Sequence, residues 1–162
     1  MKRSTKQKVL DTVVQGVSLY AAAKLLPFAI DKLASDPNAV AGFRQLGAGL
    51  GVDPTMFRYF VGGQELLVSI GLIAAAFAFL GGRVPRLERL ARLGAFLGGA
   101  GLVATMGGAI ATEYIVRPGQ QQWLVTLAIQ LLVLGAVVAG WSVVRFKKRR
   151  TPAPTGVVAM AR

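Results

Sequence analysis

The sequence predicts an all-α integral membrane protein, an antiparallel four-helix bundle with both termini in the cytoplasm. Its 162 residues are 54% hydrophobic and only 16% charged, whereas a soluble domain carries charge on about a quarter of its residues. The apolar residues fill four runs, each close to the roughly 20 residues that a helix needs to cross a bilayer. Most of the 19 lysines and arginines gather in short blocks outside these runs. These three observations exclude a water-soluble globular domain.

The first run is the least apolar of the four, because it contains Asp11, Gln15, Lys24 and Pro27. A cleaved secretory signal is the alternative interpretation, since basic residues precede the run and Ala21–Ala23 supplies small residues. We favour a span because the apolar residues continue past these alanines. The predicted membrane domain covers 9–145, and its spans lie at about 9–32, 54–80, 90–115 and 122–145.

The link between the first two spans carries helix signals of its own. Asp36 followed by Pro37 is typical of an N-cap with proline at the first helical position. A short helix over Asn38–Leu46 is therefore expected, lying in the membrane interface, and the glycines at 47, 49 and 51 would end it. Asp53-Pro54 repeats the start signal and begins the second span. A plain surface loop is the alternative.

Basic residues indicate the orientation of the spans, because lysine and arginine resist translocation. They concentrate in residues 1–8, in the connection after the second span, and in the segment 146–162, where we expect a disordered tail. Four spans place all three blocks on one side, which predicts a bacterial-type inner-membrane protein with cytoplasmic ends. The net charge of +12 is thereby explained without a nucleic-acid partner. The expected partner is the lipid bilayer.

The third span is rich in glycine, which lets helix backbones approach closely in a membrane. Gly94, Gly98, Gly101 and Gly108 form the predicted packing seam, which puts this span against more than one neighbour. The same pattern leaves a homo-oligomer open. Trp123 lies near one end of the fourth span and a second tryptophan, Trp141, near the other, as expected for interfacial anchors.

Polar residues inside the spans lie mostly in the outer half of the predicted bundle, where they are costly unless paired or used. One interpretation is structural: Glu65 pairs with Lys24, Lys32 or Arg58. The other is a pocket that takes a small polar or quinone-like molecule. Ion or proton conduction is less favoured because only one carboxylate lies deep. The candidate ligand-binding residues are Glu65, Lys24, Lys32, Arg58, Glu113 and Gln130.

Chemistry that depends on histidine or cysteine is excluded within this chain, which contains neither. No zinc, haem or iron–sulfur ligand set is available, and no nucleophile paired with histidine. We therefore expect no metal and no cofactor held by the chain itself.

Motifs between Tyr20 and Trp141 resemble the DoxX family of small four-span membrane proteins. They are a lysine closing the first span (Lys32), the link Gly42–Gly47, Asp53-Pro54, and Gly62–Leu66, which contains Glu65. The resemblance implies a membrane subunit of an oxidoreductase assembly, because one group of relatives belongs to a thiosulfate:quinone oxidoreductase. Others partner a superoxide dismutase and a sulfurtransferase.

The resemblance also singles out Lys32 and Glu65 as the characteristic pair. The expected function is a membrane subunit handling a quinone or sulfur compound in the outer-leaflet half, with Glu65, Lys32 and Lys24 as candidate catalytic residues. Glu65 would accept a proton or bind the ligand, and a lysine would stabilise negative charge. The alternatives are a non-enzymatic scaffold or accessory subunit and, less favoured, a small-solute transporter. Whether the chain is an enzyme stays open.

Overall fold

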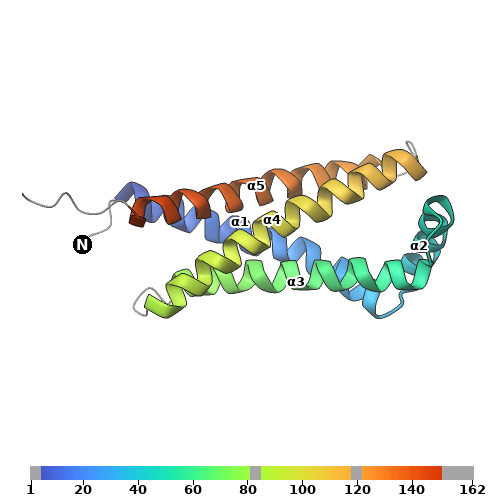
Figure 1. Cartoon of the computed structure of the whole chain (residues 1–162), viewed down its shortest axis with the longest axis horizontal. Coiled ribbons are helices and arrows are strands. Elements are labelled where there is room, and N and C mark those ends of the chain that lie inside the picture. Colours follow the sequence, from blue (N-terminus) through green and yellow to red (C-terminus); the bar gives the residue numbers. More distant parts are fainter. Residues whose placement is uncertain (1–4, 81–84, 118–121, 151–162) are drawn as a thin grey trace, which may run out of the picture.

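The computed structural model describes residues 5–80, 85–117 and 122–150, and within these ranges the chain is helical, without strands. Five helices follow one another: α1 (Thr5–Leu33), α2 (Pro37–Leu50), α3 (Pro54–Leu80), α4 (Pro85–Val116) and α5 (Gln122–Arg150) (Figure 1). This confirms the all-α prediction.

Four of these helices are long and apolar enough to cross a membrane. The spans lie at Lys8–Leu33, Pro54–Phe77, Leu90–Val116 and Gln122–Val144. Many of their large apolar side chains are exposed on the outside of the bundle, where only a hydrocarbon environment would favour them. The chain is a multi-pass membrane protein.

The helices extend beyond the predicted spans at the end opposite α2. α1 begins at Thr5, inside the segment predicted as a basic terminus, and α4 begins at Pro85. α5 continues to Arg150, so residues 146–150 are helical, which corrects the predicted disordered tail in that part. The rest of that tail, 151–162, and residues 1–4 lie outside the described residues. The sequence also predicts turns at Gly81-Gly82 and Pro118-Gly119, and both lie outside the described residues.

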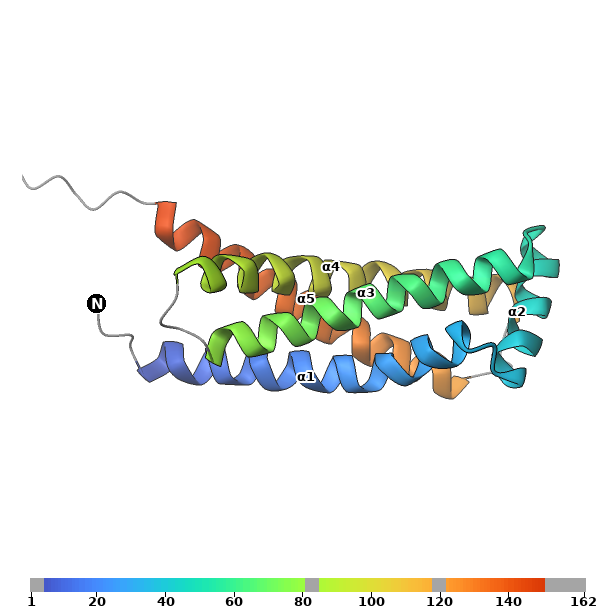
Figure 2. The same ribbon diagram turned by 90° about the horizontal axis from the view of Figure 1, so that it is seen from below.

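Each long helix packs along its neighbours to form the bundle. α1 lies against α3, α3 against α4 and α4 against α5, while a smaller contact between α1 and α5 closes the bundle. Figures 1 and 2 show α2 lying across one end, which we call the α2 end. In Figure 1 the pair α1 and α3 separates from the pair α4 and α5 toward this end. The fully buried Leu25, Leu72, Leu102, Leu131 and Val138 belong to the core between the long helices.

α2 begins at the predicted N-cap but ends later than predicted, because Gly47 and Gly49 lie within the helix and only Gly51 ends it. The Asp36 side chain accepts hydrogen bonds from the backbone N–H groups of Asn38 (2.9 Å) and Ala39 (3.4 Å), which satisfies two otherwise unpaired donors. Gly51 ends the helix in the left-handed conformation, at φ 68°, which glycine adopts without steric cost. The buried Phe43 fixes α2 to the bundle by an edge-to-face contact with Phe57 of α3, with ring centroids 5.3 Å apart.

Glycines let α4 approach both neighbours, as the sequence indicates. A Cβ at Gly98 would lie 3.0 Å from the Leu72 nitrogen of α3. A Cβ at Gly99 would lie 2.8 Å from the Gly135 carbonyl oxygen of α5. Gly94 and Gly101 also face α3, the first across from Gly71 and the second across from Val68.

Two sequence expectations about packing are wrong. Gly108 is not part of the seam, because a Cβ added there would meet nothing within 4 Å. Trp141 is buried in the core, at 7% exposure, so it is not a lipid-facing anchor. The other tryptophan, Trp123, is 62% exposed.

Candidate functional site

A partly open cavity of about 660 Å³ lies at the α2 end of the bundle, and all five helices line it. We call it the main cavity. Its walls are mostly apolar, with aromatic rings from Phe28, Phe57 and Phe60. The polar lining comes from the α2 ends of α1, α3 and α4 and from the start of α2, whereas α5 contributes apolar side chains and Trp123. The polar lining residues are Asp31, Lys32, Asp36, Asn38, Gln64, Glu65, Thr105, Thr112, Glu113 and Arg117.

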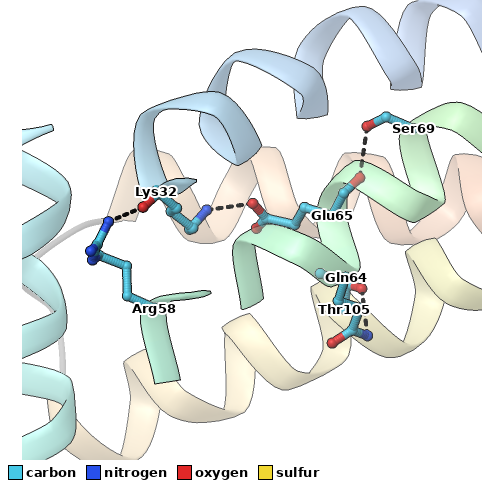
Figure 3. A network of polar contacts seen from close by, with 6 residues as sticks. All are labelled: Lys32, Arg58, Gln64, Glu65, Ser69 and Thr105. Carbon is cyan, nitrogen blue, oxygen red and sulfur yellow. Dashed lines mark hydrogen bonds and ion pairs between the residues drawn. The ribbon is translucent and has the colours of Figure 1, made fainter. Parts of the chain in front are cut away.

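Lys32 of α1 and Glu65 of α3 form an ion pair in the wall of this cavity. Lys32 Nζ donates to Glu65 Oε2 at 2.6 Å, and their side chains are 15% and 7% exposed. Figure 3 shows the two side chains pointing toward each other across the α1–α3 interface. Lys32 Nζ also lies 5.7 Å from the centroid of the Phe28 ring, within the range of a cation–π contact. This low-dielectric setting strengthens the attraction but also makes either charge costly without the other.

Two residues of α3 that are one turn apart, Arg58 and Gly62, hold Lys32 in place. The Arg58 guanidinium donates to the Lys32 backbone carbonyl (Figure 3), one of the carbonyls that the last turn of a helix leaves without an intrahelical partner. Gly62 lies against the Lys32 side chain, since a Cβ at residue 62 would be 2.9 Å from Lys32 Cβ. Of the cations proposed as partners for Glu65, Lys32 is the one that bonds to it, while Arg58 acts on the Lys32 backbone.

A second polar pair in the main cavity was not among the predicted ligand-binding residues. Gln64 Nε2 of α3 donates to Thr105 Oγ1 of α4 at 2.9 Å, and both residues line the cavity. Figure 3 shows this pair on the opposite side of α3 from Lys32. The sequence contained a signal for it, because Thr105, Gly108 and Thr112 form a polar stripe, and all three line the cavity.

A third polar pair joins Glu113 in the last turn of α4 to Arg117, which directly follows the helix, through Arg117 Nη2 and Glu113 Oε1. Both residues line the main cavity and also a smaller hollow of about 290 Å³ between α4 and α5. Among the described residues, the buried Glu113 Oε2 and Arg117 Nε have no hydrogen-bond partner. The predicted site residue Glu113 therefore belongs to the cavity wall.

Two predicted site residues lie elsewhere. Lys24 is exposed on α1, with its ammonium 5.8 Å from the centroid of the Tyr20 ring, and does not line the cavity. Gln130 is exposed on α5 and also does not line it. Toward the opposite end of the bundle, Asp11 and Arg92 are buried, although the sequence placed Arg92 in a surface block. Of the six predicted ligand-binding residues, three line the main cavity (Lys32, Glu65 and Glu113) and three do not (Lys24, Arg58 and Gln130).

The lining of the main cavity suits a small amphiphilic ligand. Apolar walls with a few convergent polar groups are typical of binding sites for small organic molecules. Lys32 has N–H donors beyond the one that bonds to Glu65, and a carboxylate accepts several hydrogen bonds. Within the described residues, no group of three or more metal-ligating side chains was found.

Fold and site together define a class: a four-span, multi-pass membrane protein with a mostly apolar cavity that contains a few polar side chains and lies next to a short crossing helix. Comparison with protein-family models, with curated proteins and with solved structures gives no match. The resemblance to the DoxX family therefore stays a prediction.

Proposed function

We propose that this protein binds a small amphiphile of the quinone class in the main cavity, as a DoxX-like membrane subunit of a larger oxidoreductase assembly. The observation that carries the proposal is a mostly apolar cavity of about 660 Å³ with the Lys32–Glu65 pair in its wall. The apolar ring and tail of such a ligand would pack against the cavity walls, and the Lys32–Glu65 pair would form a hydrogen bond with an oxygen on the ring. A sulfur compound of similar polarity is the alternative ligand.

The proposed arrangement is an antiparallel bundle with both termini in the cytoplasm and the α2 end on the outer side. Its support is the basic block at the start of α1 and the second block at the end of α5, both opposite α2. Such blocks favour the cytoplasmic side. The main cavity then lies in the outer-leaflet half, where a membrane-dissolved ligand has access.

Topology can be tested with single cysteines, because the chain has no cysteine of its own. The two variants are Arg44→Cys, which places the thiol on the exposed face of α2, and Lys6→Cys, which places it near the start of α1. In intact cells a membrane-impermeant maleimide should label the first variant and not the second. The reverse pattern would contradict the orientation.

Ligand binding can be tested with the purified protein in lipid nanodiscs. The probe is a fully substituted benzoquinone with a decyl chain, and its Kd is measured by quenching of tryptophan fluorescence. We expect Glu65→Gln and Lys32→Gln each to weaken binding about tenfold, the value of one hydrogen bond to a charged group. Lys24→Gln is the matched control on the same helix and should bind normally. Unchanged binding in the first two variants would contradict the proposal.

The second candidate function is a non-enzymatic scaffold or accessory subunit. The observation that favours it is that these polar groups are already paired across the α1–α3 interface. Lys32 bonds to Glu65, and Arg58 donates to the Lys32 backbone carbonyl. In that case Glu65→Gln would disrupt assembly with a partner subunit, and neutralising Lys32 as well would restore it. Co-purification of a membrane or soluble redox subunit from membranes, with each variant, separates the two functions.

A further inference from the structure

We infer that the Gln64–Thr105 pair is a second ligand-binding position of the main cavity, which selects ligands carrying two hydrogen-bonding oxygens on one small ring. This inference rests on the proposed function and specifies its ligand class. Gln64 and Thr105 belong to different helices, yet their side chains meet at 2.9 Å and both line the cavity that Glu65 and Lys32 line.

The Gln64 amide retains hydrogen-bonding capacity after it contacts Thr105. A primary amide has one acceptor oxygen and two N–H donors, and Thr105 engages only one of these groups. In either orientation of the amide, one end bonds to Thr105 and the other is available. Among the described residues, that other end has no hydrogen-bond partner. The hydroxyl of Thr105 retains its own proton as a donor when it accepts from Gln64.

The positions of Gln64 and Glu65 restrict the size of the ligand. Consecutive residues in a helix are about 3.8 Å apart at Cα and point about 100° away from each other. Their side chains therefore diverge from one point on α3, Glu65 toward α1 and Gln64 toward α4 (Figure 3). A compact ring with oxygens on two edges spans such a pair, whereas a ligand with a single polar atom satisfies one side only.

A site built to hydrogen-bond a ligand atom discriminates against analogues that lack the atom, because its own polar groups are then left unpaired. The Gln64–Thr105 pair is therefore expected to contribute to selectivity as well as to affinity. A purely structural pair would instead change the affinity of all ligands alike, since helix–helix hydrogen bonds stabilise the bundle whatever it holds.

The test compares two probes in nanodiscs: the decyl-substituted benzoquinone, with two ring oxygens, and 4-decylphenol, with one. The wild-type protein should prefer the first by about tenfold. Gln64→Leu and Thr105→Val should remove this preference while leaving the Kd for 4-decylphenol within about twofold. The matched control is Thr126→Val, a threonine of α5 that does not line the main cavity and whose hydroxyl already donates to the Gln122 carbonyl at 3.0 Å. It should keep the preference.

Three outcomes would overturn the inference. If the wild-type protein binds both probes equally, the Gln64–Thr105 pair does not bind a second oxygen of the ligand. The same conclusion follows if Gln64→Leu raises the Kd of both probes by the same factor. Loss of the preference in Thr126→Val as well would show that the effect is not specific to the pair. If neither probe binds the wild-type protein, the proposed function itself fails, and the inference fails with it.

Discussion

Gly62 of α3 leaves the space into which the Lys32 side chain of α1 fits. A Cβ at residue 62 would lie 2.9 Å from Lys32 Cβ and 3.2 Å from Leu33 Cγ. Because Lys32 Cβ is fixed to the backbone, it could not move away without displacing α1. The close approach of α1 and α3 at this point is what brings Lys32 Nζ to Glu65.

Gly62→Ala is therefore expected to destabilise the protein by about 1–3 kcal/mol, the usual cost of overpacking a well-packed contact. It should also weaken binding of the decyl-substituted benzoquinone, because α1 carries Lys32. Thermal unfolding in detergent and the Kd in nanodiscs measure the two effects. Gly63→Ala is the matched control, since a Cβ there meets nothing within 4 Å. Equal behaviour of the two variants would contradict this account of the α1–α3 contact.

The Lys32–Glu65 pair should show strong energetic coupling. Lys32→Met alone leaves a carboxylate that is only 7% exposed without its cation, and breaking a buried pair in this way costs about 3–5 kcal/mol. The value should fall toward the lower end because Lys32 is 15% exposed.

The double variant Lys32→Met/Glu65→Leu should be more stable than the sum of the single variants predicts, by about 1–3 kcal/mol. The measurement is a double-mutant cycle on unfolding in mixed micelles. Additive effects of the two substitutions would show that the charges do not interact.

Arg58 should stabilise the last turn of α1, because its guanidinium donates to the Lys32 carbonyl. Arg58→Gln is expected to speed amide hydrogen exchange in the segment 29–35 by about tenfold, which corresponds to one hydrogen bond from a charged donor. Arg44→Gln removes an exposed arginine of α2 and serves as the control. Unchanged exchange in Arg58→Gln would mean that the α1 end is held by packing alone.

The contact between α4 and α5 depends on Gly99. A Cβ at this residue would lie 2.7 Å from the Ala139 backbone nitrogen, where no flexible side chain can yield. Gly99→Ala should therefore lower the free energy of unfolding by about 1–3 kcal/mol. Gly108→Ala on the same helix has open space around it and should have little effect. If both variants unfold alike, close glycine packing is not what holds α4 to α5.

The helices and their ends were largely predictable from the sequence. Span length and hydrophobicity are local properties of the sequence, so the four spans could be predicted without knowledge of the tertiary contacts. The start of α2 was equally local, since Asp36 and Pro37 act on the N–H groups of their own helix turn. The extension of α5 to Arg150 was missed because basic residues and nearby prolines suggested a disordered tail, although a helix tolerates a charged final turn.

The site was only partly predictable, because rotation of each helix about its axis decides which polar residues meet. Helix spacing left Lys24, Lys32 and Arg58 open as partners of Glu65, and the family resemblance alone singled out Lys32. The tertiary packing of α1 pairs Lys32 with Glu65 and leaves Lys24 exposed. Gln130 was assigned to the cavity only because it lies at a similar depth in the predicted bundle. In the structure its side chain is exposed on α5. The Gln64–Thr105 pair depends on the register between α3 and α4, which close glycine packing sets and which no single helix encodes.

Reactivity at Gly108 tests the central claim, an occupied ligand cavity at the α2 end, most directly. Gly108 lines the main cavity and has open space around its Cβ position, so Gly108→Cys should place a thiol there without distortion in an otherwise cysteine-free chain. Its rate of modification by a lipophilic maleimide in nanodiscs should fall at least about fivefold when the decyl-substituted benzoquinone is at ten times its Kd. Gly140→Cys, which also has open space but does not line the cavity, should react at the same rate with and without the quinone. Equal rates at residue 108 with and without quinone would contradict the account.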